Sequence, residues 1–377
     1  MKSNSSRAEP AFDSHLDHMA AALRLARRGL GNVWPNPAVG CIIVKDGLVA
    51  GRGWTQPSGR PHAETEALCR AGKQAVGATA YVTLEPCNHE GQTPPCAEAL
   101  IEAGIARVIV AVQDSDPRVA GLGIDRLKKA GIDTHVGTCQ TAARQINAGF
   151  FSRIELGRPL ITLKTAATLD GHIALANGES QWITGSPARH AAHGLRSTHD
   201  AVMVGSGTAI KDNPNLSCRL SGLSNDRRPR IVLDGRLRTP VDSELVTTAS
   251  TMPLWIITTK GHPSDQLDKY RQKDVAVIEA PVGSVGQIDL EWIVLKLGAR
   301  GLTRILVEGG GHLAASLFKA GFVDQIAWFR APSVIGNSGI SAIGEIGLEK
   351  LSEMPKFKRQ SLIEFGDDTL EILTKIS

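Results

Sequence analysis

The sequence predicts an α/β protein made of two domains. Strand and helix signals alternate along a chain of 377 residues, a length that corresponds to two or three domains. The alternation is interrupted by a polar link that ends at Arg158-Pro159, and then it starts again. We therefore place the boundary near residue 150, which gives a first domain over residues 1–150 and a second over residues 151–377.

The first domain is predicted to be a three-layer α/β unit. Apolar residues at helical spacing predict a helix over residues 13–28 that ends at Gly29, and Asp46-Gly47 between two apolar runs predicts a tight hairpin. Residues 138–157 are expected to form one more helix followed by the polar link. The remaining signals place strands over 39–44, 48–54, 78–84, 107–112 and 133–136, and helices over 63–71, 97–103 and 124–130.

The second domain repeats this alternation on a larger scale. Short apolar runs separated by helical stretches predict strands over 160–166, 201–204, 230–233, 254–258, 275–278 and 304–307. Two further strands are predicted over 325–329 and 369–373. The pattern indicates a second α/β domain.

Composition and charge exclude several classes of protein. The net charge of +4 is spread over 42 basic and 38 acidic residues, which is too dilute for a dedicated nucleic-acid binder. No apolar run approaches the roughly 18 residues of a membrane helix, and the polar N-terminus lacks the apolar core of a secretory signal. We expect a cytoplasmic protein with a small-molecule substrate and with neither nucleic acid nor membrane as partner. In that reducing compartment a cysteine pair indicates metal more often than a disulfide.

The sharpest local signal is His62-Ala63-Glu64, followed by Cys87 and Cys96. One imidazole and two thiolates can hold a tetrahedral zinc ion with an open position for water, whose pKa the metal lowers to near neutrality. Glu64 can then move protons without binding the metal, as in zinc nucleobase deaminases, although the spacer between these two cysteines is longer than in the usual signature. The alternative is a closed structural site with His89 as the fourth ligand, which would leave Glu64 without a role.

The second domain carries two glycine turns, each between a predicted strand and a helical stretch. They are Glu308-Gly309-Gly310-Gly311 and Gly205-Ser206-Gly207-Thr208. Glycines there let backbone amides approach a phosphate at the positive end of a helix. An ordinary dinucleotide fingerprint belongs to the first strand–helix unit of its domain, with an acid about 20 residues later. The first of these turns lies late in its domain and Asp324 comes too early, so the pair predicts a phosphate-bearing ligand in a less common kind of site. Either turn alone could be a simple connection.

These residues resemble the bifunctional riboflavin-biosynthesis deaminase–reductase family. The similarity rests on residues 35–40, 62–64, 86–96 and 116–121 and covers about residues 13–335. It implies a cytidine-deaminase-like first domain and a dihydrofolate-reductase-like second domain. By this match His62, Cys87 and Cys96 bind zinc, Glu64 moves protons, and Asn36 and His89 line the pyrimidine pocket. Asp116 stands where relatives have asparagine, and its role stays open.

In the second domain the resemblance follows the family's reductase pattern, with NADPH as cofactor. The cofactor contacts that it implies are Ala166, Trp182, Thr208, Asp212, Gly310, Gly311, His312, Leu313, Ala314, Ala315 and Ser316. The implied substrate contacts are Lys164, Ser180, Thr184, Arg196, Leu216, Arg219 and Glu308. Gly235 stands where relatives often have a serine near the cofactor, so this contact is expected to be absent.

The resemblance implies two reactions in sequence. The first removes an exocyclic amine from a diaminopyrimidinone that carries a ribosylamino phosphate. The second transfers hydride from NADPH to C1 of the sugar and converts ribose to ribitol. Arg196 and Arg219 are expected to hold the phosphate, and the proton donor stays open among Lys164, Asp212 and Glu308.

Two other functions remain to be compared with this one. The first is a nucleoside or tRNA deaminase with an unrelated C-terminal domain, although that enzyme would need basic patches or stacking aromatics, and aromatic residues make up 4% of the chain. The second is a zinc-stabilised nucleotide-sensing module without turnover. We expect the bifunctional enzyme, assembled as a homo-oligomer, either a dimer or a tetramer.

Overall fold

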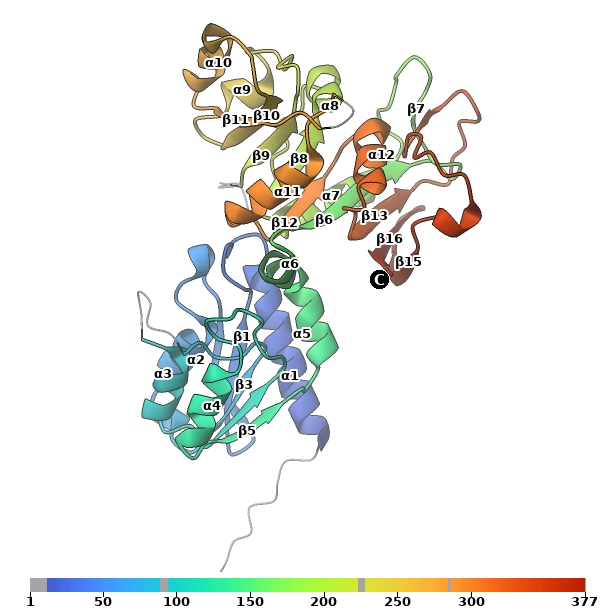
Figure 1. Cartoon of the computed structure of the whole chain (residues 1–377). Helices are drawn as coiled ribbons and strands as arrows, with labels where there is room; N and C mark the ends of the chain where they lie inside the picture. Colours follow the sequence, from blue (N-terminus) through green and yellow to red (C-terminus); the bar gives the residue numbers. More distant parts are fainter. Residues whose placement is uncertain (1–11, 89–93, 223–227, 284–285, 377) are drawn as a thin grey trace, which may run out of the picture. The chain divides into compact units, whose positions relative to one another are not determined.

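The computed structural model describes residues 12–88, 94–222, 228–283 and 286–376 (Figure 1). The chain forms two compact units, Met1–Leu156 and Gly157–Ser377. The first unit extends to residue 156, and Phe150 and Phe151 are buried in its core. No helix in these described ranges is both long and apolar enough to cross a membrane.

A five-stranded sheet forms the centre of the first unit, with strand order β2-β1-β3-β4-β5. β1 pairs antiparallel with β2 and with β3, whereas β3, β4 and β5 run parallel to one another. The strands are β1 (Gly40–Lys45), β2 (Leu48–Trp54), β3 (Thr79–Val82), β4 (Arg107–Val110) and β5 (Asp133–Val136).

Helices cover both faces of this sheet, which confirms the predicted three layers (Figure 1). A Cβ atom on Gly40 would lie 2.0 Å from the carbonyl oxygen of Ala22, so α1 packs directly on one face. Gly53 pairs with Cys41, the residue after Gly40, and therefore faces the other side. A Cβ atom there would lie 2.0 Å from the carbonyl oxygen of Ala63 in α2. The first helices are α1 (Phe12–Ala26), α2 (Ala63–Ala71), α3 (Cys96–Glu102) and α4 (Leu122–Lys129).

The segment expected to hold one helix and a polar link instead forms two helices, α5 (Gln140–Ile146) and α6 (Ala148–Leu156). Asn147 lies between them with a buried side chain. Its Oδ1 accepts from the amide of Ala38 at 2.8 Å, and its Nδ2 donates to the carbonyl oxygen of Ala38 at 2.9 Å. The polar residue therefore marks a packing contact to the segment before β1 and not a linker.

A nine-stranded sheet forms the second unit, with strand order β11-β10-β9-β8-β12-β6-β13-β16-β15. The strands from β11 to β13 in this order are parallel, and β16 and β15 add an antiparallel hairpin at one edge. The strands are β6 (Leu160–Ala167), β8 (Ala201–Gly205), β9 (Arg230–Leu233), β10 (Leu254–Thr259), β11 (Ala276–Ala280), β12 (Arg304–Val307), β13 (Gln325–Arg330), β15 (Phe357–Phe365) and β16 (Asp368–Lys375).

Three strands of this unit have no counterpart in the sequence prediction. They are β15 and the small pair β7 (His172–Ala174) and β14 (Ile340–Ser341), which forms a separate two-stranded sheet. The helices of the unit are α7 (Ser186–Ser197), α8 (Ser206–Lys211), α9 (Glu244–Thr247), α10 (Ser264–Arg271), α11 (Leu290–Ala299) and α12 (Gly311–Lys319).

The strand order determines where the loops of the second unit meet. β12 lies between β8 and β6, and all three strands run in the same direction. Their carboxyl ends therefore reach the same edge of the sheet, which is where parallel α/β sheets bind their ligands. α8 follows β8 directly and α12 follows β12 after a glycine turn, so both helices begin at this edge.

Candidate functional site

Three side chains of the first unit lie close enough to bind one metal ion. The ligand atoms of His62, Cys87 and Cys96 all lie within 4.8 Å of one another. His62 Nδ1 is 3.2 Å from Cys96 Sγ and 3.7 Å from Cys87 Sγ. A tetrahedral zinc ion with ordinary bond lengths holds such atoms roughly 3.3–3.8 Å apart. The one imidazole and two sulfurs therefore fit zinc, and three protein ligands leave one position of the tetrahedron open.

Two helix starts position these ligands. His62 immediately precedes α2, and Cys96 is the first residue of α3. The Cys96 amide donates to Cys87 Sγ at 3.4 Å, a contact that favours the thiolate. Contact with Cys96 and His62 lowers the pKa of the Cys87 thiol to about 4. The close packing of α2 on β2 requires glycine at position 53, so this glycine helps to place His62.

Glu64 is a buried acid next to the metal cluster. It lies in the first turn of α2 and is 3% exposed. Burial raises the pKa of its carboxyl to about 7, although the positive charge of His62 acts in the opposite direction. A carboxyl that titrates near neutral pH can take up and release a proton under the same conditions. Glu64 is therefore placed beside the three ligands with the chemistry of a proton carrier.

A second buried acid, Glu85, holds a loop against the cysteine segment. Its two carboxylate oxygens accept hydrogen bonds of 2.9–3.2 Å from the backbone amides of Asp114, Gly121, Gly123 and Ile124. Because Glu85 is two residues before Cys87, these bonds fix the loop next to a metal ligand. Within the loop, the buried carboxylate of Asp116 pairs with the exposed guanidinium of Arg118 at 2.5 Å.

Of the two residues predicted to line the pyrimidine pocket, the structure describes Asn36 but not His89. Asn36 lies against the segment that leads to His62, since a Cβ atom on Gly59 would be 1.9 Å from Asn36 Nδ2. His89, which is also the candidate fourth ligand of a closed site, lies outside the described residues. Its two possible roles therefore remain predictions.

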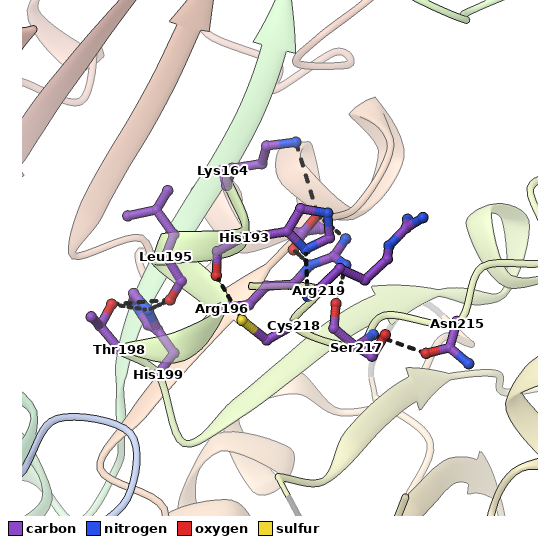
Figure 2. A network of polar contacts seen from close by, with 11 residues as sticks. Lys164, His193, Leu195, Arg196, Thr198, His199, Asn215, Ser217, Cys218 and Arg219 are labelled. Carbon is purple, nitrogen blue, oxygen red and sulfur yellow. Dashed lines mark hydrogen bonds and ion pairs between the residues drawn. The ribbon is translucent and has the colours of Figure 1, made fainter. Parts of the chain in front are cut away.

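A polar network in the second unit is centred on the carboxylate of Glu308, the residue after β12. Figure 2 shows Lys164 and Arg196, which take part in it. Arg196 in α7 binds the Glu308 carboxylate in a bidentate arrangement, with Nε 2.6 Å from Oε1 and Nη2 3.0 Å from Oε2. Lys164 in β6 places Nζ 3.8 Å from Oε2. The side chains of Glu308, Arg196 and Lys164 are 9%, 14% and 18% exposed, so the three charges are mostly removed from water.

The charges in this network shift each other's protonation. Burial lowers the pKa of the Lys164 ammonium, and the charge of Glu308 opposes that shift. Burial alone would raise the pKa of Glu308, but the charges of Arg196 and Lys164 hold it at about 2. Glu308 is therefore an ionised acceptor near neutral pH. Lys164 is the member of the pair that can give up a proton.

Arg196 and Arg219 have different environments. The third nitrogen of Arg196, Nη1, donates to the carbonyl oxygen of Ser217 at 2.7 Å, so each of its nitrogens has an acceptor within the protein. The side chain of Arg219 is exposed, and its backbone amide donates to His193 Nδ1 at 3.2 Å (Figure 2). The structure thus shows Arg196 as the partner of Glu308, whereas Arg219 presents its guanidinium to solvent.

The two glycine turns lie side by side at the edge formed by β8 and β12. A Cβ atom on Gly310 would lie 4.0 Å from Thr208 Oγ1, and one on Gly207 would meet nothing within 4 Å. α12 begins at Gly311, so its first amides point to this open edge. These features fit a phosphate-bearing cofactor at a helix start.

The other predicted contact residues of the second unit differ in exposure. Trp182, Asp212 and His312 are exposed, Ala166, Ser180, Leu313 and Ser316 are half-buried, and Thr184, Leu216, Ala314 and Ala315 are buried. The ring of Trp182 lies 4.6 Å from the guanidinium of Arg189. Leu216 packs into a hydrophobic core cluster, so its backbone is the part that can face a ligand. Among the described residues, no hydrogen bond or ion pair joins Ser180 or Asp212 to the Glu308 network.

The sequence prediction did not include Glu85 or His193. Glu85 binds backbone amides, and no pattern of residue types indicates where those amides lie. His193 is three residues before Arg196 in α7, and helical spacing puts both side chains on one face of that helix.

These features define a class of protein: a zinc-dependent deaminase joined to an α/β reductase that uses a phosphate-bearing cofactor. The comparisons with known proteins agree with each half. Residues 13–112 match the cytidine and deoxycytidylate deaminase zinc-binding region, and residues 159–370 match the RibD C-terminal domain.

Whole-chain relatives and structures give the same result. The riboflavin biosynthesis protein RibD of Escherichia coli is 42% identical over 93% of this chain and 96% of its own, and that of Aquifex aeolicus is 40% identical over the same shares. The solved structure of Acinetobacter baumannii RibD (form 1) has 35% identity and a TM-score of 0.86, with 97% of this chain and 99% of that chain covered. The chain belongs to the RibD family, the bifunctional deaminase–reductases of riboflavin biosynthesis.

Family membership decides several of the sequence predictions. The α/β fold class, the deaminase and reductase activities, and the cofactors zinc and NADPH are confirmed. The alternative of a nucleoside or tRNA deaminase with an unrelated C-terminal domain is wrong, because the second half matches the RibD C-terminal domain. The sensing module without turnover is excluded for the same reason.

Proposed function

We propose that the His62–Cys87–Cys96 cluster is the deaminase centre and that the Glu308 network with the glycine turns is the reductase centre. Residues Met1–Leu156 would then perform the hydrolysis and Gly157–Ser377 the reduction. The observation that carries this proposal is that each centre is built from residues of one unit alone.

In the deaminase centre the proposed roles follow from burial and protonation. When bound, zinc supplies a water molecule of near-neutral pKa. Glu64 holds a proton on its buried carboxyl and delivers it to the departing exocyclic nitrogen. Asn36 and His89 orient the pyrimidine ring, and the loop fixed by Glu85 forms another part of the pocket. Because Glu64 is not one of the three metal ligands, its side chain remains free to move during the proton transfer.

In the reductase centre NADPH supplies the hydride, and the protein positions the reactants and stabilises charge. Lys164 donates the proton to the ring oxygen of the opening sugar, because burial makes its ammonium more acidic than usual. Glu308 is the ionised partner that keeps Lys164 in place, and it accepts a hydrogen bond from a hydroxyl group of the sugar. Arg196 holds Glu308 through two hydrogen bonds, so we propose it as a positioning residue.

We propose a phosphorylated ribosylaminopyrimidine as the substrate. The solved structure from Thermotoga maritima, described as a diaminohydroxyphosphoribosylaminopyrimidine deaminase/5-amino-6-(5-phosphoribosylamino)uracil reductase, has 31% identity and a TM-score of 0.83 over 97% of this chain. In this chain Arg219 is the exposed guanidinium beside the Glu308 network. A guanidinium binds phosphate through planar, often bidentate donors, so Arg219 is our candidate for the phosphate contact.

We further propose that the enzyme acts in the cytoplasm as a homo-oligomer, either a dimer or a tetramer. The support for association is the outermost position of β15 in the large sheet, where β16 is its one neighbour among the described strands. Leu362 and Ile363 of this strand are 52% and 43% exposed. An edge strand with exposed apolar side chains favours pairing with another chain, and a second copy of the same strand provides a two-fold symmetric partner.

The experiment that tests the proposed function is incubation of the full chain with the diaminopyrimidinone phosphate, with and without NADPH. Mass spectrometry should detect the deaminated product in both reactions and the product reduced by two hydrogens only when NADPH is present. Reduction without prior deamination would contradict the proposed order. No deamination by zinc-loaded protein would contradict the role of the metal cluster.

A further inference from the structure

The turn after β9 reaches the same edge of the large sheet as the two glycine turns. β9 runs parallel to β8, so the residues that follow β9 lie beside the start of α8. From this turn Arg238 extends to Ser206, the first residue of α8, and its Nη2 donates to Ser206 Oγ at 2.9 Å. An exposed cation therefore stands next to the open turn that contains Gly207 and Thr208.

Asp234 fixes this turn from the inside. Its side chain is completely buried, at 0% exposure. Its Oδ2 accepts from the amide of Arg238 at 2.6 Å, from the amide of Thr239 at 2.7 Å and from the hydroxyl of Thr239 at 2.8 Å. These bonds hold the backbone of Arg238 in place. They also keep the carboxylate away from any ligand at the surface.

The choice between an acid and a cation at such a position distinguishes two kinds of dinucleotide site. In nicotinamide-dinucleotide sites of parallel α/β sheets, an acid binds the ribose 2′-hydroxyl of NADH, whereas an arginine accommodates the 2′-phosphate of NADPH. Here the acid at the end of β9, Asp234, points into the core, and Arg238 faces solvent. In the part of the chain that the structure describes, the recorded contacts of Arg238 include no carboxylate partner for its guanidinium.

We propose that Arg238 binds the 2′-phosphate of NADPH and makes the reductase discriminate against NADH. This inference rests on the proposed function, which places the cofactor along the glycine turns. A guanidinium offers a phosphate planar, bidentate donors, and Ser206 Oγ adds a hydroxyl to the same group. The 2′-phosphate is remote from the transferred hydride, so Arg238 acts on the choice of cofactor and not on the chemical step.

The direct test compares adenosine 2′,5′-bisphosphate with adenosine 5′-monophosphate, which differ only in the 2′-phosphate. Calorimetry with the full chain should show that Arg238→Gln weakens binding of the bisphosphate about 10- to 100-fold and leaves that of the monophosphate unchanged. Arg238→Lys should give an intermediate loss, because an ammonium binds phosphate as a point charge. Arg236→Gln is the matched control, since Arg236 is an exposed arginine in the same turn.

Steady-state kinetics provides a second readout. Arg238→Gln should raise the KM for NADPH about 10- to 100-fold and leave the KM for NADH, the KM for the pyrimidine and the deaminase activity unchanged. Unchanged affinity of Arg238→Gln for the bisphosphate overturns the proposal, as does an equal loss in Arg236→Gln. Gly310→Val tests the cofactor position separately, because a bulky side chain there would block the glycine turn. If that variant keeps its NADPH affinity, the cofactor site itself lies elsewhere.

Discussion

At the residue scale, the deaminase centre separates proton transfer from metal binding. Glu64→Gln keeps the size of the side chain and removes the ionisable group, so zinc should stay bound while deamination falls about 10²- to 10⁴-fold. Metal analysis and mass spectrometry measure the two effects in one preparation. Reduction of supplied deaminated substrate is the control and should persist. Near-normal deamination would remove Glu64 from its proposed role.

The three metal ligands give a second prediction at this scale. Cys87→Ser and Cys96→Ser should lose most of their bound zinc, because the two remaining protein ligands bind the metal too weakly. His89→Ala should keep its zinc, since an open site does not use a fourth protein ligand. Zinc per chain is measured by elemental analysis. A loss in His89→Ala as large as in Cys96→Ser would show that the site is closed.

Arg196 and Glu308 form the mostly buried ion pair of the reductase centre. Because the pKa of Glu308 is lowered from 4.5 to about 2, the pair stabilises the folded state fully above pH 4.5. This contribution is lost as the pH falls through about 2. Across the neutral range the carboxylate therefore stays charged and its geometry stays constant.

Arg196→Ala tests this coupling. Removal of the guanidinium raises the pKa of Glu308, so the acid limb of the reductase pH profile should move to higher pH and kcat should fall. Breaking a mostly buried pair should also lower the stability of the second unit by roughly 3 kcal/mol. Arg219→Ala is the matched control: it should raise the KM for the phosphorylated substrate and leave the acid limb in place. The same limb shift in both variants would contradict the separate roles.

At the element scale, the sequence predicted the buried strands at the centre of each sheet. β12 and β9 are short apolar runs, and both have the predicted bounds. β15 escaped prediction because its residues do not alternate between core and solvent: Phe357, Ser361 and Phe365 are half-buried and the others are exposed. Its structure depends on backbone pairing with β16, which leaves no pattern in the residue types.

The two centres were predictable to different degrees for a similar reason. His62 and Glu64 share the start of one helix, so their proximity follows from local sequence. The pair of Arg196 and Glu308 joins α7 to the end of β12, and it forms because β12 lies inside the sheet between β8 and β6. That strand order cannot be deduced from the periodicity of a single sequence.

The outermost strand of the large sheet, β15, gives a prediction about assembly. Leu362→Lys and Ile363→Lys place charges on opposite faces of the edge strand and should shift the protein towards the monomer. Sedimentation equilibrium measures the mass directly. Leu48→Lys is the control, because Leu48 is an exposed apolar residue of β2 in the first unit, at 76% exposure. An unchanged mass in both β15 variants would place the interface elsewhere.

At the scale of the whole molecule, each unit has a hydrophobic core of its own, and we propose one reaction centre for each. Removal of zinc with a chelator should therefore abolish deamination and leave the reduction of supplied deaminated substrate intact. Both rates are measured on the same sample before and after treatment. Restoring zinc should restore deamination. A parallel loss of reduction would show that the reductase depends on the metal centre.

Glu85 has a consequence for how this enzyme family can change over evolutionary time. Its carboxylate binds backbone amides and no side chain of the loop over residues 114–124. Exposed side chains of that loop that bind no backbone atom can therefore be exchanged while the chain keeps its path beside the cysteines. Arg118 is such a side chain, because it is exposed. Asp116 is different: it is buried and its Oδ1 accepts from the amide of Arg118 at 3.0 Å, so it helps to fix the loop itself. We expect that, if the loop lines the proposed deaminase pocket, single substitutions at such exposed positions change the pocket surface with no compensating change in the fold.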